Sequence, residues 1–84
     1  MTLIQRQDAL VQKLEPIYEN YFKRGYLGQD LAGKRSKAKR LHHEEMIKAG
    51  YSKQEAIDST NQCDGVAYRN ADHKAWMQQM GVTA

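Results

Sequence analysis

Residues 2–27 read TLIQRQDALVQKLEPIYENYFKRGYL, and their pattern sets the fold class. Apolar side chains recur every three or four residues, which gathers them into one broad stripe on a helix, whereas the period-two alternation of a strand is absent. The stripe keeps its phase across Pro16, so we predict one helix over about 2–26 that kinks at the proline and does not restart there. The stripe consists of Leu3, Ile4, Leu10, Val11, Leu14, Ile17, Tyr18, Tyr21 and Phe22.

A second helix is predicted over residues 30–49. Asp30 is a suitable N-cap, because its carboxylate can accept hydrogen bonds from the free N–H groups of the first turn. At the other end, Gly50 fits the left-handed position that follows a helix, and Tyr51 would be the apolar residue after it in a Schellman motif. The apolar positions of this helix are sparse, and they are Leu31, Ala38, Leu41, Met46 and Ile47.

The run from Ser52 to Glu55 reads as a capping box, in which the serine oxygen accepts from the N–H of residue 55 and the glutamate returns to the N–H of residue 52. This box predicts the start of a third helix over 52–80. Asp64 and Gly65 offer a break, but a row of small side chains at three- and four-residue spacing favours one continuous helix that another helix can approach closely. The row consists of Ala56, Thr60, Cys63, Ala67, Ala71 and Ala75.

These elements predict an all-α fold, a small bundle of three main helices in a single helical domain over residues 1–84. A chain of 84 residues with 40% hydrophobic content buries a thin core. The first helix carries more apolar surface than two short partners can cover, so we expect a protein partner or a homodimer to hide the excess. The expected core comprises Leu3, Leu10, Leu14, Ile17, Tyr21, Leu41, Met46, Ile47, Ile57, Ala67, Ala71 and Trp76.

Composition and motifs exclude several classes of protein. One cysteine rules out a disulfide framework, and no apolar run approaches the roughly 18 residues of a membrane-spanning helix. The first residues carry a charge every few positions and lack the apolar core of a secretory signal, so we expect a cytoplasmic protein. No Gly-rich phosphate loop, GxSxG turn or paired-carboxylate motif occurs, so we expect neither an enzyme nor a cofactor.

The run His42–Glu45, together with Cys63 and His73, contains the residue types that bind zinc. Neighbouring histidines on a helix point about 100° apart, however, and cannot face one ion. No CxxC, HxxxH or HExxH motif is present. We therefore predict no metal site, and we expect Cys63 to be a buried, unreactive thiol within the row of small residues.

The net charge of +3 is concentrated in the middle of the chain. Residues 31–50 hold six basic and two acidic side chains. Basic clusters displace counterions from phosphates and are typical of nucleic-acid contacts, but on an ideal helix these charges surround the axis and form no stripe. A solvated helix face, a nucleic acid and an acidic protein surface all fit this segment. Its candidate contact residues are Lys34, Arg35, Lys37, Lys39 and Arg40.

Aromatic side chains are candidate anchors for a protein partner. Tyr18 and Tyr26 lie toward one end of the first helix, next to Lys23 and Arg24. Rings beside cations can stack on bases or anchor a protein, and the alternative is that both tyrosines line the rim of the core. With the tryptophan of the third helix added, the candidate anchors are Tyr18, Tyr26 and Trp76.

The stretch from Ala56 to Val66 loosely matches the spacing of a helix-turn-helix motif, with Gln62–Gly65 as its turn. In that motif, a second helix starting near Val66 would enter the major groove of DNA. Asn61 and Arg69 occupy positions that are usually apolar in the motif, so the match is weak.

Two classes of function follow from these patterns. The first is a small non-enzymatic adaptor or regulator that binds a macromolecular partner, such as an inhibitor or accessory subunit of a nucleic-acid machine. The second is a nucleic-acid-binding protein that uses the segment Lys34–Arg40 directly. The basic charges surround their helix and form no docking stripe, which favours the protein partner.

Overall fold

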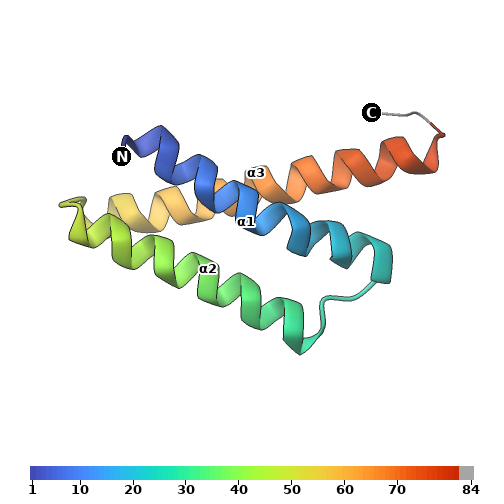
Figure 1. The fold of residues 1–84 in the computed structure, drawn as a ribbon, viewed down its shortest axis with the longest axis horizontal. Helices are drawn as coiled ribbons and strands as arrows, with labels where there is room; N and C mark the ends of the chain where they lie inside the picture. Colours follow the sequence, from blue (N-terminus) through green and yellow to red (C-terminus); the bar gives the residue numbers. More distant parts are fainter. Residues whose placement is uncertain (82–84) are drawn as a thin grey trace.

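The computed structural model describes residues 1–81 and consists of three helices, α1 (Leu3–Arg24), α2 (Gly28–Lys48) and α3 (Lys53–Gln79) (Figure 1). No strand occurs among these residues, so the predicted all-α bundle of three helices is confirmed. α1 crosses α3 near the middle of the molecule and diverges from it toward the ends, while α2 runs along one side (Figure 1). The bundle measures 45 × 27 × 17 Å along its principal axes.

α1 is one continuous helix with Pro16 inside it, as predicted. Its N-terminus carries a capping box that we did not predict. Thr2 Oγ1 accepts from the Gln5 N–H at 3.2 Å, and Gln5 Oε1 accepts from the Thr2 N–H at 2.9 Å. The helix ends where Gly25 takes a left-handed φ of 80° and donates its N–H to the carbonyl of Tyr21. Glycine suits this position because it has no Cβ to oppose a positive φ.

The prediction of Asp30 as the N-cap of α2 is wrong. α2 begins at Gly28, whose φ of 72° turns the chain shortly after α1, and Asp30 lies inside the first turn. There its carboxylate accepts a hydrogen bond from Arg24 Nη1 at 3.0 Å, which lowers the pKa of Asp30. Leu27 occupies the N-cap and makes no side-chain capping bond. The negative charge of Asp30 is therefore stabilised by Arg24 and by the dipole at the start of α2.

The predicted Schellman motif at the end of α2 is confirmed. Gly50 adopts a φ of 96° and donates its N–H to the Ile47 carbonyl at 3.0 Å. The N–H of Tyr51 reaches back to the Met46 carbonyl at 3.1 Å. These two bonds satisfy carbonyl groups that the end of the helix would otherwise leave free.

α3 starts at the predicted capping box and continues to Gln79. Ser52 Oγ accepts from the Glu55 N–H at 3.1 Å, and Glu55 Oε1 accepts from the Ser52 N–H at 3.0 Å. The helix passes through Asp64 and Gly65 without a break, so the alternative of two helices is wrong. The helix-turn-helix interpretation is wrong with it, because that motif needs a turn there.

The core lies where α1 crosses α3, and α2 closes one side of it. Leucines of α1 pack on small side chains of α3, which lets the two helices approach closely. Met46 of α2 is also buried. The main cluster consists of Leu10, Leu14, Ile17, Tyr18, Leu31, Cys63, Ala67 and Ala71.

Several expected core residues lie at the surface instead. Ile47, Ile57 and Trp76 each directly follow a buried or half-buried residue, so they point about 100° away from the face that packs in the bundle. Leu41 is different, because it lines a groove between α1 and α2 that no other part of residues 1–81 fills. The exposed residues that we had placed in the core are Leu3, Leu41, Ile47, Ile57 and Trp76.

Candidate partner-binding surfaces

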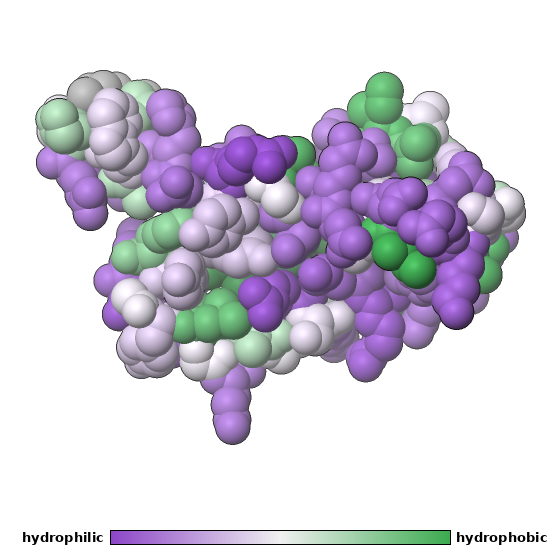
Figure 2. Space-filling model, turned by 180° about the vertical axis from the view of Figure 1, so that it is seen from behind, coloured by the Kyte–Doolittle hydropathy of each residue, from purple (hydrophilic) through white to green (hydrophobic). Residues whose placement is uncertain are grey.

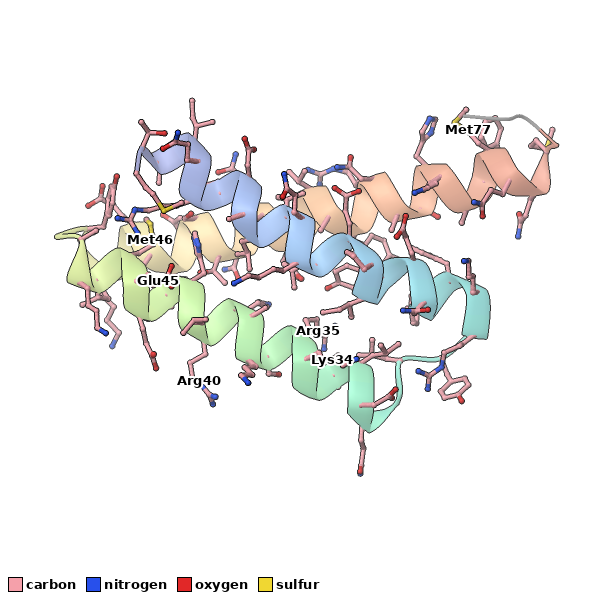
Figure 3. All side chains as sticks on the ribbon, in the orientation of Figure 1. Lys34, Arg35, Arg40, Glu45, Met46 and Met77 are labelled. Carbon is pink, nitrogen blue, oxygen red and sulfur yellow. The ribbon has the colours of Figure 1, made fainter. Side chains whose placement is uncertain are left out.

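The five cations of the basic segment divide into two groups. Lys34, Lys37 and Arg40 are exposed, whereas Arg35 and Lys39 are half-buried. The three exposed cations follow one another every third residue, so they form a short row along α2. Figure 3 shows Arg40 pointing away from the bundle. We call these three residues the cationic row.

The two half-buried cations meet a carboxylate and a phenol. Lys39 Nζ lies 3.6 Å from Asp64 Oδ2, and the Tyr18 hydroxyl donates to Asp64 Oδ1 at 2.5 Å. Burial and the bond to Asp64 raise the pKa of Tyr18, and Arg35, which lies beside the hydroxyl, acts in the opposite direction. These contacts tie α1 and α2 to the middle of α3. Lys39 and Tyr18 therefore link α2 and α1 to α3, whereas the cationic row stays exposed.

A groove of about 400 Å³ lies between α1 and α2. Its wall on α1 is formed by residues three or four positions apart, which share one helix face, and its wall on α2 follows the same rule. Ile17 and Leu31 form the buried base, while Leu41 stays partly exposed at one end. The floor of the groove is apolar and comprises Pro16, Ile17, Leu31, Ala38 and Leu41.

Three lysines form the rim of this groove, namely Lys13 on α1 and Lys34 and Lys37 on α2. Within residues 1–81, none of the three forms a salt bridge, and no carboxylate lines the groove. We did not predict a role for Lys13, because the groove exists only once two helices face each other. The one sequence signal was the spacing of residues 13, 16, 17 and 20, which places them on a single helix face.

The three candidate aromatic anchors lie in different surroundings. Tyr18 is 5% exposed and belongs to the core, so in this structure its ring offers no surface to a partner. Tyr26 is exposed in the connection between α1 and α2, where the Arg24 guanidinium stands 4.3 Å from its ring centroid. Trp76 is 55% exposed near the end of α3, and its ring stacks on His73 with 6.2 Å between centroids. Of the three candidate anchors, Tyr26 and Trp76 are therefore the accessible ones.

The last turns of α3 project from the bundle. Lys74 Nζ pairs with Glu19 Oε1 of α1 at 2.7 Å, and beyond Lys74 no described side chain of α3 makes a polar contact with α1 or α2. Figure 2 shows this end as a lobe that stands clear of the rest of the molecule. We call residues 75–81 the projecting end. Trp76 and Met80 are its large exposed side chains.

A buried pair of serine and histidine lies near the opposite end of the bundle, and we did not predict it. Ser59 Oγ accepts a hydrogen bond from Gln7 Nε2 at 3.2 Å and lies 3.0 Å from His42 Nε2. The serine hydroxyl can donate to His42 only if the histidine is neutral, and burial lowers the pKa of His42. Among residues 1–81, the two side chains line separate hollows, with His42 on one and Ser59 on the other.

Cys63 is buried, as predicted, and burial raises the pKa of its thiol. Among residues 1–81, no three His, Cys, Asp or Glu side chains gather closely enough to bind a metal ion. None of the three helices combines the length and apolar character that a bilayer-spanning segment requires.

Comparison of the chain with protein-family models, with curated proteins and with solved structures gives no match. Its function has to be inferred from the chemistry of its own surfaces, which are the groove, the cationic row and the projecting end.

Proposed function

We propose that this protein is a small non-enzymatic adaptor or regulator that acts by binding a protein partner. The projecting end of α3 carries the proposal, because its tryptophan is 55% exposed. Tryptophan often dominates the binding energy of protein interfaces, and methionine adapts to varied surfaces. An inhibitor or accessory subunit of a nucleic-acid machine suits this protein, because its cationic row favours a partner that is itself bound to phosphates.

A second copy of the chain is the simplest candidate partner. Light scattering over a range of concentrations distinguishes a 9.7 kDa monomer from a dimer. A dimer that Trp76→Ala dissociates would identify the second copy as the partner. If the chain is a monomer, its partner is a different protein. We expect that partner in the cytoplasm, where we propose that this chain acts.

Photo-crosslinking from position 76 tests the proposal. A photoreactive amino acid in place of Trp76 should join the chain to its partner in cells that produce both proteins. The same amino acid in place of Asn61, which is also exposed on α3, should not. The purified partner should then bind Trp76→Ala about thirtyfold more weakly than the wild type, which corresponds to roughly 2 kcal/mol.

Ile4→Ala is a matched control, because Ile4 is an exposed apolar residue at the other end of the molecule. This variant should bind the purified partner with wild-type affinity. The proposal fails if no protein is crosslinked from position 76, or if Trp76→Ala and the wild type bind the crosslinked protein equally well.

Direct binding of nucleic acid is a second candidate function, and the cationic row favours it. If Lys34, Lys37 and Arg40 each meet one phosphate of duplex DNA, log Kd should change with log salt by a slope of magnitude about 2.7, at roughly 0.9 per phosphate. Replacing all three by alanine should abolish this binding and leave the helices intact. Absence of binding to duplex DNA, single-stranded DNA and RNA at about 50 mM salt would eliminate this candidate.

A further inference from the structure

The groove between α1 and α2 is a second surface that the projecting end does not explain. We infer that it receives an acidic amphipathic helix from a protein partner. The groove lies between α1 and α2, whereas Trp76 belongs to α3. The inference therefore does not depend on the partner proposed for the projecting end.

The groove has the length of a short docked helix. Its α2 wall extends from Leu31 to Leu41, which corresponds to ~15 Å at 1.5 Å per residue, or about three helical turns. Helices dock into hydrophobic grooves through apolar side chains spaced three, four and seven residues apart. A volume of about 400 Å³ accommodates a few such side chains.

The floor supplies apolar contact for those side chains. Ile17 and Leu31 are buried at its base, Ala38 is half-buried, and Leu41 and Pro16 are exposed. Apolar surface thus lies uncovered in a concave site. Removal of this surface from water provides the driving force for docking.

The rim selects the charge of the occupant. Lys13 stands on one side of the floor, and Lys34 and Lys37 stand on the other, with no carboxylate between them. In the part of the chain that the structure describes, the adjoining hollow along α1 and α2 contains one acidic side chain, Glu45, and Arg6 Nε is buried there without an acceptor. This side of the bundle is therefore short of acceptors, and a helix with carboxylates on both flanks would supply them.

A nucleic acid is the alternative occupant, and the shape of the groove disfavours it. Phosphates gain nothing from the exposed apolar side chains of Pro16 and Leu41, whereas apolar side chains of a helix do. Arg40, the outermost cation of the cationic row, does not line the groove. The lysines that do line it flank an apolar floor, which is the pattern that an acidic amphipathic helix complements.

Three synthetic helical peptides, titrated into the 84-residue chain, test this inference. The first carries leucines along one face and glutamates on both flanks, the second has lysines in place of the glutamates, and the third keeps the glutamates but scatters the leucines. Fluorescence anisotropy should show the second and third peptides binding about tenfold more weakly than the first, or not at all. NMR signals of Ile17, Leu31 and Leu41 should shift with the first peptide at concentrations at which the other two leave them unchanged.

Charge exchange identifies the rim. The double variant Lys34→Glu, Lys37→Glu should bind the acidic peptide about tenfold more weakly and the basic peptide more tightly than the wild type does. Lys53→Glu, at an exposed cation outside the groove, should change neither affinity. Leu41→Ser should weaken binding of the acidic peptide, whereas Ile47→Ser should not, although the two residues are 41% and 43% exposed on the same helix.

Equal binding of the acidic and basic peptides would overturn the inference, as would NMR shifts confined to residues outside the groove. The chain could instead bind nucleic acid in preference to the acidic peptide. If the Lys34→Glu, Lys37→Glu variant loses that binding, the rim lysines bind phosphates. Trp76→Ala should bind the acidic peptide as the wild type does. A loss in that variant would show that the groove is not a separate site.

Discussion

The hydroxyl of Tyr18 on α1 donates a hydrogen bond to Asp64 on α3 at 2.5 Å, and the other oxygen of that carboxylate lies 3.6 Å from Lys39 of α2. One carboxylate therefore joins all three helices. Tyr18 is buried, so water does not readily replace this bond if it is removed. The sequence positions of the three residues gave no indication of this contact.

Tyr18→Phe should destabilise the fold by about 1–2 kcal/mol, because it removes a hydrogen bond to a charged group that keeps its contact with Lys39. Urea unfolding followed by circular dichroism measures the change. Tyr68→Phe is the control, since the Tyr68 ring packs on Tyr18 with 5.3 Å between centroids, but its hydroxyl forms no described side-chain hydrogen bond. Equal unfolding midpoints for the two variants would show that the Asp64 bond does not stabilise the fold.

Two glycines of α2 should respond to alanine in opposite directions. Gly28 has a φ of 72°, and an added Cβ would lie 2.8 Å from both Arg24 Nη2 and Asp30 Oδ1, so Gly28→Ala should destabilise the fold by roughly 1–2 kcal/mol. Gly33 lies inside the helix with open space around it, so Gly33→Ala should stabilise by roughly 0.5–1 kcal/mol. Thermal unfolding of both variants provides the measurement. A gain in stability for Gly28→Ala would contradict the connection between α1 and α2 described above.

Ser52→Ala should destabilise the fold by about 1 kcal/mol, because it removes the hydroxyl that accepts from the Glu55 N–H. Glu55→Ala should have a smaller effect, because it removes only the reciprocal bond to the Ser52 N–H. Chemical denaturation of both variants tests the capping box. Midpoints that match the wild type in both cases would mean that the box contributes nothing in solution.

Acid should weaken the fold through His42. Burial lowers the pKa of His42 below its ordinary 6.5, with Arg6, Lys13 and His43 acting in the same direction and Glu45 opposing them. The unfolded chain then binds the proton more readily than the folded chain. The stability due to neutral His42 is complete above pH 6.5 and is lost as the pH falls below that value toward the folded pKa.

Urea unfolding between pH 8 and pH 5 measures this dependence. His42→Gln, which cannot titrate, should lose less stability over that range than the wild type. Parallel losses in the two proteins would show that other groups cause the acid sensitivity.

The helix ends were largely predictable because their signals are local. Gly50, Tyr51 and the box from Ser52 to Glu55 act within a single turn, and their hydrogen bonds form as expected. The box formed by Thr2 and Gln5 has a related local pattern, so it was equally accessible from the sequence. Asp30 was misplaced because its partner, Arg24, belongs to the preceding helix.

The candidate sites were only partly predictable, because burial depends on where other helices lie. The spacing of the basic segment could not show that Lys39 would face Asp64, or that Tyr18 would be buried beside them. We expected Trp76 in the core with Ala67 and Ala71, but on an ideal helix it points about 140° away from Ala71. It is exposed because it points away from the face of α3 that packs on α1, although Lys74, two residues earlier, still pairs with Glu19 of α1.

The helices that share most of the core are the first and the last to be synthesised. Leu10 and Leu14 emerge from the ribosome well before Cys63, Ala67 and Ala71, the small residues against which they pack, have been made. α2 covers only one side of α1, so a nascent chain that ends before Ala67 leaves those leucines open to chaperones. The bundle therefore closes only once α3 has been made, and truncation within α3 should yield an unfolded, protease-sensitive product instead of a smaller domain.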